Sequence, residues 1–228
     1  MSIPLIRFAL LDSTQSFLAR HPELGFCGVL ADEQSAGRGR GENRWESSPG
    51  AGLWLSAALP IQDVPPGLVL QRAMAAVVEV LEPCGLNLGL KWPNDLVAWK
   101  DGRMVKLGGV IGEFKGDRMI LGLGLNLRAA PNLPDRPIPP ACLVELGASE
   151  LPDSLTLARS ILDAWQDLTI LREPGFWWPS KGDPLQWEEG QGICEGWLED
   201  GQLSVRTSEG LRTLCSGDVS GLARFSSS

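Results

Sequence analysis

Apolar positions recur along the chain with two different periods, and the two periods predict different elements. Residues 8–20, FALLDSTQSFLAR, predict a short strand followed by a helix, with the polar residues DST placed to cap the helix. Residues 67–85 predict a helix that is apolar on most faces and therefore buried, and that ends at a proline and a glycine. Residues 152–168 predict a capped amphipathic helix.

Shorter apolar runs predict β-strands between these helices. Residues 25–34 and 52–60 each predict one strand, the first of which runs out into a polar loop. Residues 86–127 predict four strands, and the sequences KDGR and KGDR within them are typical of hairpin turns. Residues 129–140, AAPNLPDRPIPP, contain too many prolines for a helix or a sheet, so they predict an ordered surface loop.

The pattern changes near the C-terminus. Residues 172–184 predict a connection, and from about Gly190 short strands with glycine turns predict a small β-barrel that ends in a frayed tail, FSSS. Helices mixed with strands of antiparallel type, followed by a β module, favour an α+β fold over a doubly wound sheet. We therefore expect a first domain over residues 1–185 and a second over residues 186–228.

Composition sets limits on the function. The chain has 228 residues, of which 43% are hydrophobic and 21% charged, and its formal net charge is -8. This is enough chain for one full-sized domain and a small one. We expect no transmembrane helix, because no apolar run is long enough, and no secretory signal, because the start of the sequence has no basic region ahead of a long apolar core. The acidic balance argues against broad binding of nucleic acid, which requires a basic face.

The five cysteines are widely spread, odd in number and without a C-x-x-C pair. They predict reduced, mostly buried thiols, as in the cytosol, and give no zinc framework. His21 is the only histidine and precedes Pro22 at a predicted helix end. We expect it on the surface, so acid–base chemistry based on histidine is not expected.

An arginine-rich loop is the first candidate for chemistry. Residues 35–45, SAGRGRGENRW, hold three arginines and three glycines, but they match neither G-x-x-x-x-G-K-[ST] nor G-x-G-x-x-G. Backbone N–H groups and guanidinium forks suit phosphate and carboxylate groups. The alternative is a solvated loop with some salt bridges.

Two further stretches carry groups that suit anionic ligands. In KWPNDL, residues 91–96, the side-chain oxygens of Asn94 and Asp95 can face a hydrated Mg²⁺ or a catalytic group, or simply cap a turn. In KLGGVIGE, Lys106 can neutralise a carboxylate or an α-phosphate, and Gly108 and Gly109 would let a flat ligand lie against the strand. The alternative for Lys106 is a surface lysine before a close-packed strand.

Asn126 ends the fourth candidate stretch, GLGLNL, where small residues alternate with leucine. Its side-chain amide can donate to and accept from a purine edge. A strand that ends in a turn is the alternative.

The order of these stretches resembles the biotin protein ligase family. The family pattern has a serine–threonine pair, a G-R-G-R loop ending in tryptophan, K-W-P-N-D-L, K-x-G-G and G-x-G-x-N. The matching residues are Ser13-Thr14, Gly37–Arg40 with Trp45, Lys91–Leu96, Lys106–Gly109 and Gly122–Asn126. The segment from about residue 192 also looks like the SH3-like end module of the family, so the resemblance covers nearly the whole chain.

The resemblance implies a fold and an activity. The fold would be a class II aminoacyl-tRNA synthetase-like mixed sheet flanked by helices, followed by a small SH3-like β-barrel. The activity would be the formation of biotinyl-5′-AMP from biotin and MgATP, followed by transfer of biotin to a lysine of the biotin carboxyl carrier protein of acetyl-CoA carboxylase. The resemblance implies a cytoplasmic enzyme with no nucleic-acid or membrane partner, and it leaves a homodimer open.

The resemblance also implies roles for single residues. Lys106, Arg38 and Arg40 would be catalytic, with Lys106 bridging the biotin carboxylate and the α-phosphate. The residues implied to bind biotin or ATP, besides these three, are Ser13, Thr14, Gln15, Gln34, Gly37, Gly39, Trp45, Asn94, Asp95, Gly108, Gly109 and Asn126.

Each group of these binding residues would contact a different part of biotin or ATP. Ser13, Thr14, Gln15 and Gln34 would meet the ureido end of biotin, and Gly109 would line its slot. Asn94 and Asp95 would order the phosphates, Mg²⁺ and Lys106. Asn126 would meet adenine, with Trp45 stacked near it, and the arginine loop would close over the intermediate.

The chain departs from the family pattern in the arginine loop. Glu42 and Asn43 stand where the family has a second glycine–arginine pair, and a carboxylate there weakens the positive field of the loop. We expect this loop to become ordered only when ligand binds. Gln15 stands where asparagine is frequent. The early Ser13-Thr14 pair leaves no room for a DNA-binding winged helix, so a repressor role is not expected.

Two other functions stay open at this point. One is a lipoate ligase or octanoyltransferase, which shares the catalytic fold. The other is a protein that binds biotin or an adenylate without efficient turnover, a reading that rests on Glu42 and Asn43 alone.

Overall fold

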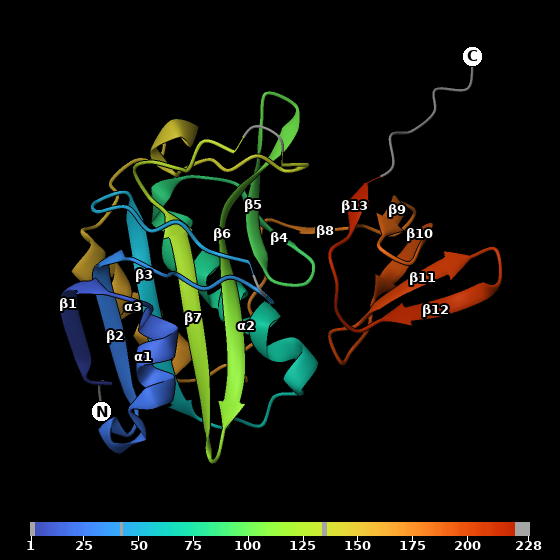
Figure 1. The fold of residues 1–228 in the computed structure, drawn as a ribbon. Helices are drawn as coiled ribbons and strands as arrows, with labels where there is room; N and C mark the ends of the chain where they lie inside the picture. Colours follow the sequence, from blue (N-terminus) through green and yellow to red (C-terminus); the bar gives the residue numbers. More distant parts are fainter. Residues whose placement is uncertain (1–2, 42, 134–135, 222–228) are drawn as a thin grey trace.

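Eight strands form the larger of two β-sheets in the computed structural model, which describes residues 3–41, 43–133 and 136–221 (Figure 1). In chain order they are β1 (Leu5–Leu11), β2 (Cys27–Gln34), β3 (Gly52–Pro60), β4 (Leu88–Lys91), β5 (Asp95–Lys100), β6 (Arg103–Lys115), β7 (Arg118–Asn126) and β8 (Phe176–Trp178). Their spatial order is β1-β2-β3-β7-β6-β5-β4-β8. The β1–β2 and β4–β8 pairs are parallel and the other neighbours antiparallel. The predicted mixed sheet of an α+β fold is therefore confirmed.

Helices cover both faces of this sheet (Figure 1). They are α1 (Thr14–Arg20), α2 (Pro66–Leu81) and α3 (Ser154–Trp165). Alternate residues of a strand point to opposite faces, and the core divides accordingly. Ala58 of β3 packs with Leu18 under α1, whereas its neighbours Ala57 and Leu59 belong to the main core beneath α2 and α3.

The predicted helix ends agree with the structure. The Ser13 side chain caps α1 by accepting from the Ser16 N–H at 3.3 Å. Asp153 caps α3 by accepting from the N–H groups of Leu155 and Thr156. α2 gives way to a short 3₁₀ turn that ends at Gly85, whose φ of 73° lies in the left-handed region that favours glycine.

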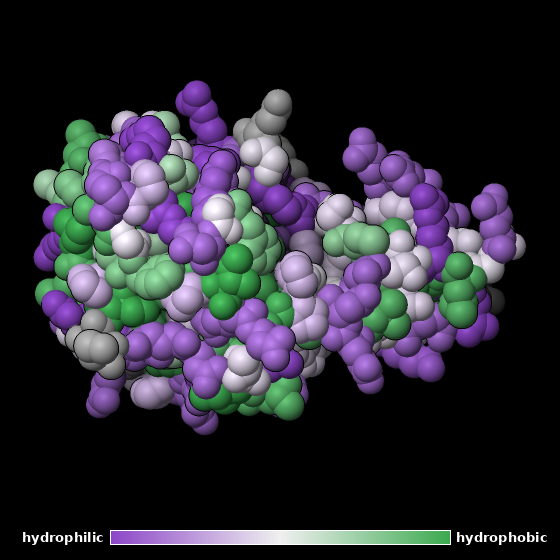
Figure 2. All heavy atoms as spheres, turned by 90° about the horizontal axis from the view of Figure 1, so that it is seen from below, coloured by the Kyte–Doolittle hydropathy of each residue, from purple (hydrophilic) through white to green (hydrophobic). Residues whose placement is uncertain are grey.

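A second sheet of five strands follows the larger one. Its strands are β9 (Pro184–Trp187), β10 (Gly190–Trp197), β11 (Leu203–Thr207), β12 (Gly210–Leu214) and β13 (Ser220–Gly221), in the order β12-β11-β10-β9-β13. They enclose a small core of their own, to which Trp92, in the turn between β4 and β5, also belongs. This sheet is consistent with the expected SH3-like module. It forms a smaller lobe whose surface is largely hydrophilic in the face seen in Figure 2.

The turn between β10 and β11 contacts the larger lobe directly. The Gly201 carbonyl accepts from the Gln71 side-chain amide of α2 at 2.6 Å and from the Trp92 indole at 3.1 Å. A Cβ at Gly201 would lie 2.4 Å from the Gly67 carbonyl oxygen, so only glycine allows this close approach. The two sheets are therefore joined by buried hydrogen bonds and a shared tryptophan.

The connection predicted over residues 172–184 is corrected by the structure, because it contains β8. This strand has three residues, too few to show an alternating pattern, and it pairs with β4 at Gly89↔Phe176. The Phe176 ring lies 2.4 Å from where a Cβ of Gly89 would be.

The second sheet also begins at Pro184, earlier than the predicted Gly190. The domain division at residue 185 stays a prediction, and the FSSS tail lies outside the described residues.

Cysteine and histidine placement agrees with the sequence. Cys27, Cys84, Cys142 and Cys194 are buried, Cys215 is exposed, and all five are free thiols. His21 ends α1 at the surface, where its ring nitrogen lies 2.7 Å from Glu23. Among the described helices, none combines the length and apolarity needed to cross a membrane.

Packing of α3 onto the sheet predicts a large effect from one truncation. Leu157 is 1% exposed in the main core, so Leu157→Ala leaves a cavity and should lower the free energy of unfolding by about 2–5 kcal/mol. Leu171 is 75% exposed, and Leu171→Ala should change it by less than about 0.5 kcal/mol. Urea unfolding followed by tryptophan fluorescence measures both. Equal effects in the two variants would contradict the packing described here.

Candidate active site

A cavity of about 840 Å³ lies where the N-terminus of α1, the arginine loop, strands β5 to β7 and the second sheet meet. Of the fifteen residues expected to bind or react, thirteen line it. They are Ser13, Thr14, Gln15, Gln34, Arg38, Gly39, Arg40, Trp45, Asn94, Asp95, Lys106, Gly109 and Asn126. Segments far apart in the sequence are thus brought to one place, while the role of each residue stays a prediction.

Gly37 and Gly108 do not line the cavity. A Cβ at Gly37 would lie 2.4 Å from the Trp45 carbonyl oxygen, and one at Gly108 would lie 2.6 Å from the Gly124 carbonyl oxygen. Both glycines therefore permit close backbone packing behind the cavity wall. Their expected part in ligand binding stays a prediction.

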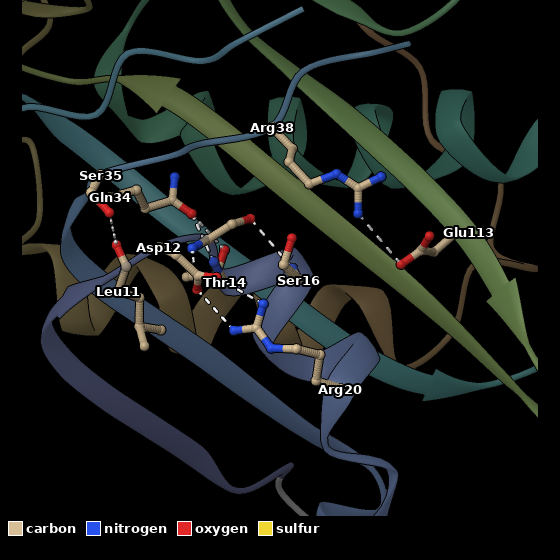
Figure 3. Close-up of polar contacts among 10 residues, drawn as sticks. Leu11, Asp12, Thr14, Ser16, Arg20, Gln34, Ser35, Arg38 and Glu113 are labelled. Carbon is tan, nitrogen blue, oxygen red and sulfur yellow. Dashed lines mark hydrogen bonds and ion pairs between the residues drawn. The ribbon is translucent and has the colours of Figure 1, made fainter. Parts of the chain in front are cut away.

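One end of the cavity is a polar pocket built on the start of α1. Thr14 donates its N–H to the Gln34 side-chain carbonyl at 2.8 Å (Figure 3), and its hydroxyl lies 2.8 Å from that of Ser56. Gln34 in turn donates to the Ser47 hydroxyl at 2.8 Å. These contacts hold small polar groups in fixed orientations. The Gln15 carbonyl oxygen beside them is buried, and no described residue donates to it.

The arginine loop forms a small hairpin. Gly39 N–H donates to the Asn43 carbonyl at 2.8 Å, and Trp45 N–H donates to the Gly37 carbonyl at 2.9 Å. Asn43, one of the departures from the family pattern, donates its side-chain amide to the Arg40 carbonyl at 3.0 Å and so supports the turn. The other departure, Glu42, lies outside the described residues. Ordering of this loop by ligand stays a prediction.

Lys106 of β6 lines the cavity. Its Nζ is 2.6 Å from Asp95 Oδ1 and 5.7 Å from the centroid of the Trp45 ring. A register shift in the β5–β6 pairing, where Leu96 pairs with Gly108 but Val97 with Lys106, marks a bulge at this point. Bulges re-aim side chains next to functional sites. Lys106 is thus a half-buried cation with one carboxylate partner.

Asn94 connects the loop to the sheet. Its amide nitrogen donates to the Val110 carbonyl at 2.7 Å, and its Oδ1 accepts from Arg40 Nη1 at 3.1 Å. Arg38 is held less closely, with Nη1 3.9 Å from Glu113 Oε1 across the sheet (Figure 3). Arg40 is therefore oriented into the cavity by an anchored amide.

Asn126 and Trp45 carry buried polar atoms that have no partner among the described residues. Asn126 donates to the Ala141 carbonyl at 3.1 Å, which leaves its Oδ1 free, and the Trp45 indole N–H is free as well. Trp45 packs edge-on against Trp54, with ring centroids 6.4 Å apart. Buried groups of this kind are costly unless a ligand or water meets them.

Several lining residues had not been expected. Gly122 and Gly124 make room on β7, because a Cβ there would lie 2.6 Å from Gln15 Oε1 and 2.4 Å from the Trp45 ring. The alternation of glycine and leucine in GLGLNL was a signal for this. Lining residues also come from the proline-rich loop and the second sheet, where no local pattern marked them. These include Leu133, Arg136, Ile138, Trp187, Glu188 and Asp218, while Ser56 of β3 and Lys91 of β4 line the cavity from the large sheet.

Positive charge is concentrated in the cavity of an otherwise acidic chain. Six lysine or arginine side chains line it against four carboxylates, whereas the whole chain has a net charge of -8. Burial lowers the pKa of Lys91, and the carboxylates of Asp95 and Asp218 only partly offset this effect. The Lys91 ammonium lies 5.6 Å from the centroid of the Trp178 ring. The cavity is therefore suited to an anionic ligand with a polar, uncharged end.

Residues 9–126, slightly more than half of the chain, match the biotin/lipoate A/B protein ligase family. The chain belongs to this family. It is 29% identical over 218 residues to the bifunctional ligase/repressor BirA of Bacillus subtilis, covering 84% of this chain and 65% of the relative. It is 34% identical over 142 residues to the biotin--[acetyl-CoA-carboxylase] ligase of Mycobacterium tuberculosis, covering 59% of this chain and 50% of that one.

Solved structures extend the similarity to both sheets of this family member. Biotin protein ligase from Aquifex aeolicus, solved in complex with biotin and ATP, superposes with a TM-score of 0.75 at 26% identity and covers 96% of this chain and 98% of its own. The fold and the order of the lobes are therefore shared. The chain spans 65% of the B. subtilis relative's length, so that relative is longer than the part that matches.

Burial of Lys91 predicts a pH dependence of stability. The cost of burying its charge is fully present below its lowered pKa in the folded state and disappears as the pH rises to the ordinary value of 10.5. The free energy of unfolding of the native chain should therefore increase relative to that of Lys91→Met between neutral pH and about pH 10.5. Urea unfolding of both proteins across this range measures the difference. A difference that stays constant with pH would contradict the assignment.

Proposed function

We propose that this chain is a biotin–protein ligase, which activates biotin with MgATP to biotinyl-5′-AMP and transfers biotin to a lysine of the biotin carboxyl carrier protein of acetyl-CoA carboxylase. The observation that carries the proposal is the cavity itself, which joins a pocket of fixed neutral polar groups to a cluster of cations around Lys106. The named activities of the M. tuberculosis and A. aeolicus relatives agree with it.

The polar pocket suits the ureido ring of biotin. A ureido group offers two N–H donors and one carbonyl acceptor. Gln15 Oε1 is a buried acceptor without a partner in the described residues, and the Thr14 and Ser56 hydroxyls can donate. The apolar side chains of Ile111 and Leu123 line the cavity next to this pocket. Biotin would lie with its ureido end at α1 and its carboxylate toward Lys106.

Adenylation brings two anions together, and the cations of the cavity address that difficulty. A carboxylate oxygen of biotin forms a bond to the α-phosphorus of ATP, the bond from that phosphorus to the bridging oxygen breaks, and pyrophosphate leaves. Lys106 would neutralise the carboxylate and the α-phosphate as they approach, and Arg40 would hold the phosphates. Asp95, 2.6 Å from Lys106, keeps the ammonium oriented before ligand arrives.

The same cations would assist the second step, the transfer of biotin to the carrier protein. The neutral amine of the carrier lysine attacks the acyl carbon of biotinyl-5′-AMP, the bond from this carbon to the phosphate oxygen breaks, and AMP leaves as the new amide loses a proton to water. Lys106 would stabilise the phosphate that departs. Because water takes the proton, this step requires no carboxylate of the protein as a base.

Asn126 and Trp45 support a site for adenine. Asn126 Oδ1, buried and free among the described residues, suits the exocyclic amino group of adenine. Trp45 lines the cavity beside Lys106 and offers a ring face for stacking.

Mg²⁺ would be bound mainly by the nucleotide. Within the described residues, His, Cys, Asp and Glu side chains form no group of three that could hold a metal ion. Mg²⁺ is often bound by one or two carboxylates together with substrate phosphates, and Asn94 and Asp95 provide oxygens of that kind at the cavity wall. When bound, the ion would neutralise phosphate charge.

The cytoplasmic location and the homodimer remain predictions.

Lys106→Ala tests the chemistry. Because the charge of Lys106 is needed most in the transition state, we expect biotin-dependent pyrophosphate release to fall by about 10²–10³-fold, while biotin affinity weakens much less. Lys115→Ala removes an exposed lysine at the far end of the same strand and should leave both quantities unchanged. Coupled pyrophosphate detection and calorimetric titration measure them. Unchanged release in Lys106→Ala would contradict the proposed mechanism.

A further inference from the structure

Asp218, in the segment between β12 and β13, places a carboxylate beside the cation cluster of Arg40, Lys91 and Lys106. The proposed chemistry gives this carboxylate no role. Asp218 lies two residues before β13, and its Oδ1 accepts a hydrogen bond from Arg40 Nη2 at 2.5 Å. Arg40 Nη1 donates to Asn94 Oδ1 at 3.1 Å. Arg40 is thus held between an amide of the large sheet and a carboxylate of the small one.

Asp218 is ionised at neutral pH and easily released. Burial raises its pKa, but the positive charges of Arg40, Lys91 and Lys106 lower the pKa by more, so it stays below the usual range. The Asp218 side chain is nevertheless 74% exposed, against 32% for Arg40. Exposed ion pairs contribute little to stability, because water solvates the separated charges well. This carboxylate can therefore leave Arg40 at small cost.

Asp95, the carboxylate beside Lys106, is held more firmly than Asp218. Asp95 begins β5, pairs with Gly109 in the sheet and has a side chain only 12% exposed, so it stays beside Lys106. Asp218 instead lies on the cavity rim in a segment between two strands of another sheet. Of the two, Asp218 is the carboxylate that an incoming anion can replace.

We propose that Asp218 is a counter-ion that occupies the polyphosphate-binding part of the cavity until the nucleotide arrives, and that it limits the affinity of that part for phosphate chains. Binding exchanges the carboxylate on Arg40 for phosphate oxygens, and Asp218 then remains nearby as a like charge. The proposal rests on the proposed function in taking the nucleotide as the occupant. Asp218 acts here as a positioning residue for Arg40.

Calorimetric titration of the full chain with inorganic triphosphate and with ATP tests this role without any requirement for biotin transfer. Asp218→Asn keeps an acceptor for Arg40 but removes the charge. We expect it to bind triphosphate about three- to tenfold more tightly at low ionic strength, and the gain to shrink at about 0.5 M salt, because exposed charges are screened. Asp218→Glu keeps the charge and should restore the native affinity.

Glu209→Gln is the matched control. Glu209 is exposed in the turn between β11 and β12, so this variant removes one negative charge from the same sheet away from the cavity. Its affinity should equal that of the native chain. An Asp218→Asn variant that binds triphosphate equally or more weakly, or a Glu209→Gln variant with the same gain, would overturn the counter-ion role. Either result leaves the ligase proposal to be judged by carrier biotinylation alone.

Discussion

Mutual repulsion among cations is the constraint on which this site depends. Arg40, Lys91 and Lys106 come from three segments and line one cavity, where their like charges repel one another. The protein meets this cost with carboxylates, Asp95 beside Lys106 and Asp218 beside Arg40. Burial lowers the pKa of Lys91, and the neighbouring positive charges of Lys106 and Arg40 lower it further. An anionic ligand would offset the repulsion that remains, so the same charges favour binding of an anion.

Backbone geometry makes room for these groups. Gly122 and Gly124 leave space on β7 for the side chain of Gln15 in the uncharged pocket and for the ring of Trp45. The bulge in the β5–β6 pairing places Lys106 opposite Val97, in the same stretch of sheet as Asp95. The second sheet is held to α2 and Trp92 by hydrogen bonds to Gly201, which fixes the edge of the cavity that Asp218 occupies. The packing that holds the fold together therefore also positions the side chains of the cavity.

Local patterns were sufficient to predict most elements, and the resemblance to a family pointed to most of the residues that line the cavity. The apolar run of β3, the caps at Ser13 and Asp153 and the hairpin turns of the central strands all agree with the structure, because each depends on neighbours in sequence. β8 was missed, because a three-residue strand has no detectable period. Asp218 was missed for a different reason: its contact with Arg40 joins residues 178 positions apart, and no local spacing encodes such a pair.

Mass spectrometry of a biotin carboxyl carrier domain, incubated with this chain, biotin and MgATP, tests the central claim most directly. The account predicts that the carrier gains the mass of one biotinyl group on a lysine, and that lipoic acid in place of biotin gives no gain. A carrier that stays unmodified while the chain still binds biotin would contradict the ligase function and favour a binding protein. A gain with lipoic acid instead of biotin would assign the chain to the lipoate branch of the family.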